Sequence, residues 1–311
     1  MRKYADAHCD TMVKLFEEKK ELFLNDRHID IERLKSFYAP LQCFAIWLNP
    51  KYYPISMRQC MRYIDFYYQQ IGKNADCIGH INQYADLQKN MKQNKISALL
   101  TIEGGEALEG EISALRIYHQ LGVRSISLTW NYRNALADGV GECGTGGGLT
   151  RFGREVVLEM EKLGMIVDVS HISEVGFWDV AVLANKPFIA SHSNAQQICD
   201  VARNLTDMQL KIIAEKGGVV GVNLYPPFLT KQKYAKMEDI IKHINHMLLV
   251  MGEDYICLGS DFDGIDYTPT EIEQLEDMEV LYEGLRREFG VRIAEKIFSE
   301  NLIRVIKDVL G

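Results

Sequence analysis

The stretch MIVDVSH, residues 165–171, runs through apolar and β-branched residues and then ends on a histidine. The stretch PFIASHS, residues 187–193, repeats the pattern with His192 near its end. A continuous apolar run of this length is typical of a strand buried on both faces of a parallel sheet. A helix-length segment joins the two runs, so their strands end at the same edge of the sheet. We therefore expect His171 and His192 to face one site.

Six further runs of this type alternate with amphipathic segments along the chain. They occupy residues 4–10, 41–48, 96–105, 123–130, 218–225 and 255–264. Helical spacing of apolar residues is clearest at 148–164, which stops at Gly164. Eight strands alternating with helices is the count of an α/β (β/α)8 TIM barrel, which we expect to span residues 1–311 as a single domain. The strand count leaves an open, doubly wound sheet as the alternative.

Composition and charge exclude several classes of protein. The 311 residues carry a net charge of −8, which argues against nucleic acid as a partner because phosphate binding needs a basic face. The N-terminus MRKYADAHCD lacks the apolar run of a signal peptide, and no segment is apolar enough to cross a membrane. The seven scattered cysteines, Cys143 among them, form no CxxC pair. We therefore expect reduced thiols, no membrane association and a cytoplasmic location.

Histidines and carboxylates collect at the ends of five of the predicted strands, where barrels of this class build their sites. They are His8, Asp10, Glu103, His171, His192, Asp261 and Asp263. Neutral imidazole with carboxylate is the ligand set of zinc or a similar divalent ion. The combination is more specific than any one member, since a histidine at one strand end is usually a packed or surface residue.

The spacing of these residues predicts two ions. His8 and Asp10 are two residues apart on a strand and project to the same face, so they can bind one ion together. His171 and His192 can hold a second. Glu103 has two oxygens and can bridge ions spaced roughly 3.5–4 Å apart. Each residue also has a structural interpretation, since Asp10 could instead cap the helix that follows it.

Other polar residues of the sequence have simpler explanations. SDFDG, residues 260–264, could be only an acidic turn. His243 and His246 have helical i,i+3 spacing inside residues 237–252, away from any strand end, so we expect them on a solvated face. His28 has no evident companion in the sequence.

The sequence resembles the membrane dipeptidase (renal dipeptidase) family, the M19 metallopeptidases, over essentially its whole length. The resemblance rests on DAHCDT at 6–11, IEGGEAL at 102–108, GLTRFGREVVLEMEKLGMIVDVSHISE at 148–174, ASHSNAQQICDVARNLTD at 190–207 and LGSDFDG at 258–264. The long middle segment is the most specific of these.

The resemblance implies a metallo-dependent hydrolase barrel with two Zn²⁺ per chain. His8 and Asp10 would bind one zinc and His171 and His192 the other, with Glu103 as the bridge. It further implies that Asp261 is the catalytic acid/base and that Arg203 holds the terminal carboxylate of the substrate, a group that a guanidinium fork suits. A homodimer is suggested only by the family.

One position departs from the family pattern. In the mammalian members a histidine follows the "LT" of the segment SLTWNYRNALADG and is thought to contact the substrate, whereas here the residue is Trp130. Asn131, Tyr132 or a zinc would substitute for it. Asn131 and Tyr225, the latter at the end of the run 218–225, are the candidate substrate contacts.

The resulting hypothesis is a zinc-dependent dipeptidase of membrane-dipeptidase type that uses a metal-bridging hydroxide and also accepts L,D-dipeptides. The first rival is another barrel amidohydrolase, such as a lactonase, phosphotriesterase or cyclic amidase. Those sites typically start with HxH and often use a carboxylated lysine, whereas this chain has HCD and Glu103. A binding module with a structural metal is a second rival. A glycosidase that pairs Glu103 with Asp261 leaves three histidines unexplained.

Overall fold

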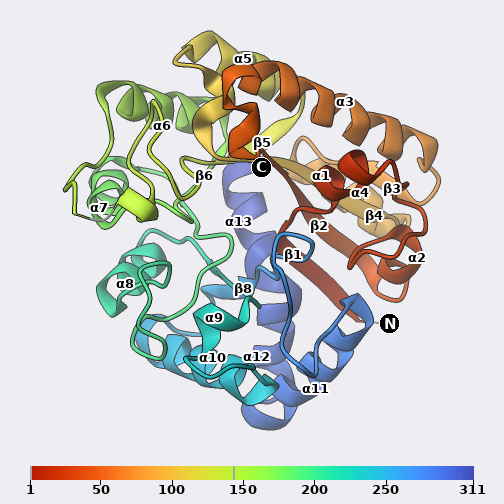
Figure 1. The fold of residues 1–311 in the computed structure, drawn as a ribbon. Helices are drawn as coiled ribbons and strands as arrows, with labels where there is room; N and C mark the ends of the chain where they lie inside the picture. The colour runs from red at the N-terminus through yellow and green to blue at the C-terminus, as the bar shows by residue number, and fades with distance from the viewer. Residues whose placement is uncertain (1, 143) are drawn as a thin grey trace.

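The computed structural model describes residues 2–142 and 144–311, and its centre is a ring of parallel strands surrounded by helices (Figure 1). The strands are β1 (Lys3–Cys9), β2 (Tyr38–Trp47), β3 (Ile78–His80), β4 (Ile96–Glu103), β5 (Val123–Ser127), β6 (Ile166–Asp168), β7 (Val220–Val222) and β8 (Ile256–Leu258). They follow the order β6-β5-β4-β2-β1-β8-β7, with β3 paired to the start of β4. The expected (β/α)8 barrel class is confirmed, with β3 as an additional short strand.

The ring closes between β6 and β7 through residues that do not form a continuous strand. Ile189 bridges to Asp168 and Ala190 bridges to Val220, both in the parallel sense. The predicted strand at 187–193 is therefore wrong in extent, since only two of its residues pair. The reason lies in Ser191, whose backbone N–H donates to the side-chain carboxylate of Asp168 at 3.0 Å instead of to a backbone carbonyl of a neighbouring strand.

The helices pack around the outside of this ring. They are α1 (Thr11–Glu18), α2 (Ile31–Leu34), α3 (Ser56–Lys73), α4 (Tyr84–Lys92), α5 (Ile112–Gln120), α6 (Arg151–Leu163), α7 (Glu174–Leu183), α8 (Asp207–Glu215), α9 (Pro226–Leu229), α10 (Met237–Met251), α11 (Met278–Phe289), α12 (Val291–Glu295) and α13 (Asn301–Leu310). Helix α6 shows how individual residues set the two ends of a helix. Thr150 accepts from Gly153 N–H at its start, and Gly164 ends it at φ 68°.

Helix α13 closes the end of the barrel opposite to the carboxyl ends of the strands. Its apolar face, with Leu302 and Ile306, packs in one cluster with Ala5, Leu41 and Leu99 from the first halves of their strands. This end of the barrel is a filled core, and the polar residues are left for the other end.

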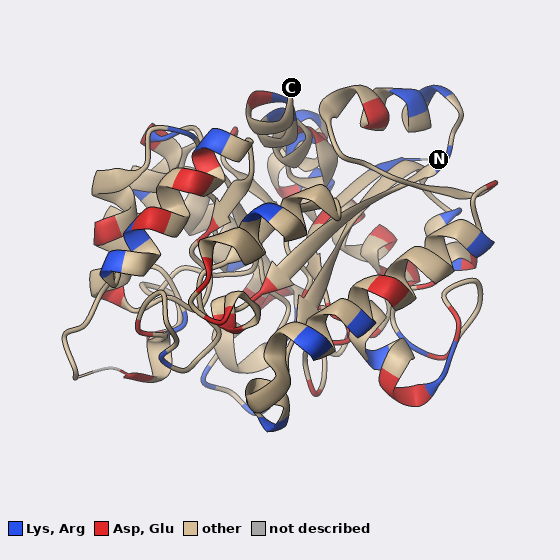
Figure 2. Cartoon of the chain, turned by 90° about the horizontal axis from the view of Figure 1, so that it is seen from above, with Lys and Arg blue, Asp and Glu red and all other residues tan. Residues whose placement is uncertain are grey.

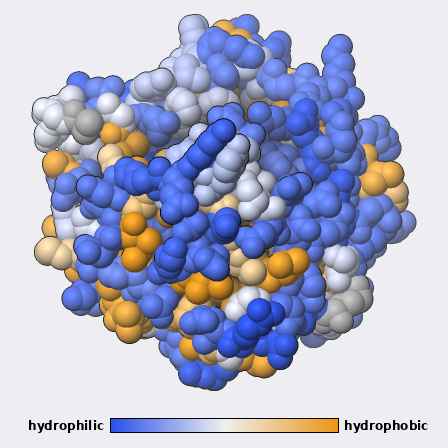
Figure 3. Space-filling view, turned by 60° about the horizontal axis from the view of Figure 1, so that its bottom comes forward, coloured by the Kyte–Doolittle hydropathy of each residue, from blue (hydrophilic) through white to orange (hydrophobic). Residues whose placement is uncertain are grey.

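Charged residues of both signs are spread over the outer helices (Figure 2). The face drawn in Figure 3 is mostly hydrophilic, with its hydrophobic side chains in several separate groups. Among the described helices none is both long and apolar enough for a membrane crossing. Six described cysteines are free thiols, as expected, and Cys143 lies outside the described residues.

Two glycines allow β7, β8 and the bridged segment to approach closely beneath the site. A Cβ added at Gly221 or at Gly259 would lie 1.9 Å from the carbonyl oxygen of Ser191. We expect Gly259→Ala to lower the free energy of unfolding by about 1–3 kcal/mol, because the backbone must move apart. Gly72→Ala in α3 is the control, since its Cβ would meet nothing within 4 Å. This substitution should raise the free energy of unfolding by at most about 1 kcal/mol. Urea unfolding measures both, and equal effects would contradict this account.

Candidate metal centre

Six of the predicted residues meet at the carboxyl ends of the strands. His8 lies in β1 and Glu103 ends β4, whereas the other four follow β1, β6, the bridged segment and β8 in turns. All six are buried, and three overlapping groups of their ligand atoms each lie within 4.8 Å. They are His8, Asp10, Glu103, His171, His192 and Asp261. We call this set the strand-end cluster.

One half of the strand-end cluster comes from β1. His8 Nε2 lies 3.3 Å from Asp10 Oδ2 and 3.5 Å from Glu103 Oε2. Asp10 occupies the N-cap position of α1 but makes no side-chain cap hydrogen bond, so its carboxylate is available to the cluster. His8 Nε2 and Asp10 Oδ1 are both buried without a hydrogen-bond partner. Buried polar atoms are costly without partners, and a cation between them would satisfy both.

The other half joins two histidines to the same glutamate. His171 Nε2 lies 2.8 Å and His192 Nε2 3.5 Å from Glu103 Oε1, and the two imidazole nitrogens are 2.8 Å apart. Two bare imidazole nitrogens converge in this way when they bind one cation. Glu103 thus directs one oxygen to each half, the arrangement that a bridging carboxylate needs.

The charges of the cluster depend on burial. Burial lowers the pKa of His171 to about 4 and holds that of His192 well below its usual range. Both imidazoles are therefore neutral at pH 7 and have a free lone pair for a cation. Burial also acts to raise the pKa of Glu103, but the facing imidazoles, above all the positive charge of His8, outweigh it and hold that pKa well below the usual range.

Asp261 differs electrostatically from Glu103. Burial, with the negative charges of Asp10 and Glu103, raises its pKa to about 7, against the opposing charge of His8. Asn223 Nδ2 donates to its Oδ2 at 2.9 Å. A carboxyl group with a pKa near neutrality can both accept and release a proton under working conditions.

Contacts outside the cluster fix the orientation of its members. His171 Nδ1 and Asn131 Oδ1 are 2.7 Å apart, so the ring donates its Nδ1–H to the amide oxygen and directs the bare Nε2 to the cluster. His171 and Asp261 adopt left-handed backbone conformations, at φ 67° and φ 62°. Such strain in non-glycine residues is typical of functional sites, where surrounding contacts maintain it.

The strand-end cluster opens into a cavity of about 570 Å³. Trp47, Trp130, Asn131 and Tyr225 line it together with four members of the cluster. Both candidate substrate contacts, Asn131 and Tyr225, therefore face this cavity. Trp130, at the departure from the family pattern, packs edge-on to Trp47 with ring centroids 5.1 Å apart. The lining is acidic, since it also includes Glu17, Glu18, Asp263 and Asp266 against the two lysines Lys14 and Lys51.

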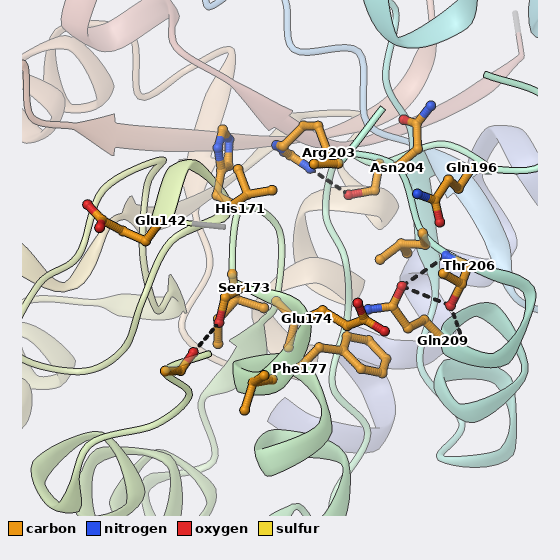
Figure 4. A pocket seen from close by; sticks show the side chains of 18 of the residues that line it. Glu142, His171, Ser173, Glu174, Phe177, Gln196, Arg203, Asn204, Thr206 and Gln209 are labelled. Carbon is orange, nitrogen blue, oxygen red and sulfur yellow. Dashed lines mark hydrogen bonds between the residues drawn. The ribbon is translucent and has the colours of Figure 1, made fainter. Parts of the chain in front are cut away.

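Arg203 lies beside this cavity rather than in its lining. It borders a second cavity of about 260 Å³ that shares His171 with the first (Figure 4). Its Nη1 donates to Ser193 Oγ and its Nη2 to the carbonyl of His192, both at 2.9 Å, whereas its buried Nε has no partner. Burial lowers its pKa to about 10, so it remains cationic at neutral pH. Its guanidinium lies 5.7 Å from the ring of Phe228, which lines the first cavity.

Two sequence interpretations need correction. Asp263 turns away from the cluster and accepts from Thr11 Oγ at 2.5 Å and from the backbone N–H of His28 at 2.9 Å, so His28 does have a companion. The predicted solvated face of His243 is wrong, because the residue is fully buried and contacts Ala195 N–H and the Leu229 carbonyl. It follows Ile240 by three positions and so shares the apolar stripe of α10, a signal that was present in the sequence.

Asn223 is a site residue that sequence reasoning missed. It directly follows β7 and is fully buried against Asp261. The signal available was a polar side chain near the end of the predicted strand at 218–225, at the same edge as the other site residues.

This fold and cluster define a metal-dependent hydrolase of the barrel class. The sequence profile of the membrane dipeptidase family, peptidase family M19, matches residues 2–310. The chain therefore belongs to the membrane dipeptidase family, which is a family of metallopeptidases.

Individual relatives agree with this assignment. Dipeptidase aclJ of Aspergillus oryzae is 32% identical over 308 residues, 94% of this chain and 72% of its own length. The crystal structure of the family M19 metallopeptidase dipeptidase AC superposes with a TM-score of 0.93 at 26% identity, covering 100% of this chain and 99% of the other. A metallopeptidase from Rhodobacter sphaeroides, bound to a phosphinate mimic of the dipeptide L-Ala-D-Ala, has a TM-score of 0.90 at 26% identity, with 99% of each chain covered.

Ionisation of Asp261 links the stability of the metal-free protein to pH. The folded chain, with the Asp261 pKa near 7, keeps a proton that the unfolded chain releases near pH ~4. Rising pH across this window therefore favours the unfolded chain, and this contribution to stability should be lost from about pH 4 to 7. Asp261→Asn removes the titration. We expect the melting temperature of the chelator-treated variant to fall less between about pH 4 and 7 than that of chelator-treated wild type. Equal changes of melting temperature with pH would refute the raised pKa of Asp261.

Proposed function

We propose that the chain hydrolyses dipeptides with two Zn²⁺ ions held by the strand-end cluster. His8 and Asp10 would hold one ion, His171 and His192 the other, and Glu103 would bridge them. The observation that carries the proposal is the convergence of both imidazole sets on the two oxygens of Glu103. Bound together, two such ions supply a water of lowered pKa and a Lewis acid for the peptide carbonyl.

Asp261 is the proposed acid/base. It lies at the cluster, with Oδ1 3.9 Å from His8 Nε2, and Asn223 holds its other oxygen. It would take the proton of the attacking water and pass it to the leaving amine, a role generally worth about 10²–10⁴-fold in rate. Nearby cations would lower its pKa from the metal-free value and so favour the ionised, proton-accepting form.

Arg203 is the proposed contact for the terminal carboxylate of the substrate. Its guanidinium is fixed by two hydrogen bonds, and its buried Nε–H has no partner. It adjoins His192, whose ring belongs to the cluster, so a carboxylate bound there would lie close to the scissile bond only in a short peptide. Asn131 and Tyr225 would complete the substrate contacts from the lining of the main cavity.

The acidic lining of the main cavity supports a substrate with a free amino group, which dipeptides carry as a cation. L,D-dipeptides are included in the proposal because the Rhodobacter sphaeroides relative binds a mimic of L-Ala-D-Ala. Lactones and phosphotriesters lack both ionic ends, so the first rival activity is disfavoured.

We also propose that residues 1–311 act as one catalytic domain. The homodimer and the cytoplasmic location stay predictions.

The test is a substrate panel with metal analysis. Zinc-loaded protein should cleave L-Ala-L-Ala and L-Ala-D-Ala, fail on tripeptides and C-terminal amides, and lose activity to a chelator until Zn²⁺ is restored. Asp261→Asn should lower kcat by at least about 10²-fold while both zincs stay bound, because it removes a proton acceptor and not a ligand. Loss of zinc from that variant would make Asp261 a ligand. Inertness of the fully loaded wild type toward all dipeptides would overturn the proposed function.

A further inference from the structure

Two buried aspartates lie beneath the strand-end cluster without belonging to it. Asp6 is in β1, and Asp168 ends β6. Each accepts both the backbone N–H and the hydroxyl of one serine: Ser260 for Asp6 and Ser191 for Asp168. Each serine directly precedes a member of the cluster, Asp261 in the first case and His192 in the second. The chain thus uses one Asp–Ser arrangement twice.

Asp168 is completely satisfied by donors from three segments. Its Oδ1 accepts from the N–H of Ser170 at 2.9 Å and of Ser191 at 3.0 Å. Its Oδ2 accepts from Ser127 Oγ and Ser191 Oγ, both at 2.5 Å. Four donors occupy the four acceptor positions of a carboxylate. The single hydrogen of the Ser191 hydroxyl is therefore directed at Asp168.

Because the Ser191 hydroxyl donates to Asp168, it can act only as an acceptor toward the ring of His192. Ser191 Oγ lies 2.8 Å from His192 Nδ1. Because its hydrogen is engaged by Asp168, the hydroxyl oxygen can only accept, and His192 must donate from Nδ1–H. The proton is thereby placed on Nδ1, and Nε2, which faces Glu103 and His171, keeps its lone pair. A reversed hydroxyl would put the proton on Nε2, where it would prevent ligation.

We infer that Asp168, acting through Ser191, is a positioning residue that sets the tautomer of His192 and hence the affinity of the His171/His192 side for its cation. The inference rests on the proposed function, since it concerns the same metal centre. The amide oxygen of Asn131 holds the proton of His171 on Nδ1 directly. Asp168 would hold the proton of His192 on Nδ1 in the same way, through the intervening hydroxyl of Ser191. Outer partners of this kind typically change metal affinity about 10–100-fold.

The second Asp–Ser pair supplies a matched control. Ser260 Oγ donates to Asp6 at 2.5 Å but contacts no imidazole, since its other neighbours are the carbonyl of His8 at 3.4 Å and the backbone N–H of Phe262 at 3.3 Å. Ser260→Ala therefore removes the same hydroxyl from the same kind of buried carboxylate without touching a ring. Ser191→Thr keeps the hydroxyl and serves as the conservative variant.

The experiment titrates metal-free protein with Zn²⁺ against a chromophoric chelator. We expect Ser191→Ala and Asp168→Asn to weaken one of the two zinc equivalents about 10–100-fold and to leave the other unchanged. Ser191→Thr and Ser260→Ala should retain both affinities. Unchanged binding in Ser191→Ala and Asp168→Asn, or an equal loss in Ser260→Ala, overturns the inference while the proposed function stands. Wild type that binds no zinc at this cluster defeats the proposed function instead.

The tautomer itself is measurable in wild-type protein, whether or not the variants fold. The ¹⁵N chemical shifts of His192 in metal-free protein at neutral pH should report a protonated Nδ1 and a bare Nε2. In folded Asp168→Asn the Nε2-protonated form should appear, because the hydroxyl is then free to reverse. A protonated Nε2 in the wild type contradicts the inference directly.

Discussion

The position of Glu103 between three imidazoles is the interaction on which the rest of the site depends. Its two carboxylate oxygens face opposite halves of the cluster, so a single side chain sets the spacing of the whole centre. Burying such a charge away from water is costly, and the cost is offset only when charged or polar partners surround it. His8 supplies the nearest positive charge in the metal-free chain, and divalent cations would supply more.

The barrel makes this convergence possible because parallel strands all end at one edge. Residues far apart in the chain, such as His8 and Asp261, meet because β1 and β8 are neighbours in the ring. The opposite end is filled by apolar residues of α13, which leaves a single polar mouth. Strained turns at His171 and Asp261 then direct side chains that a regular strand would point elsewhere.

Much of this architecture could be predicted because burial on both faces gives parallel strands continuous apolar runs. The strand-end residues were found by the same logic, and the structure brings all six predicted members of the cluster together. The contacts of Asn131 with His171 and of Asn223 with Asp261 could not be predicted, since they depend on tertiary packing. The same holds for Arg203, which the fold places at the wall of a second cavity. His243 was misjudged because its distance from any strand end was taken to mean exposure, although the residue lies in the apolar stripe of α10.

The relation to the membrane dipeptidase family gives this geometry its chemical meaning, while Trp130 marks a local departure in the cavity wall. The central proposal is that Glu103 would bridge two cations. Anomalous diffraction from a crystal grown with Zn²⁺, measured across the zinc absorption edge, tests it most directly. The account predicts two peaks roughly 3.5–4 Å apart, one beside His8 and Asp10 and one beside His171 and His192. A single peak away from Glu103, or no peak within the cluster, would contradict it.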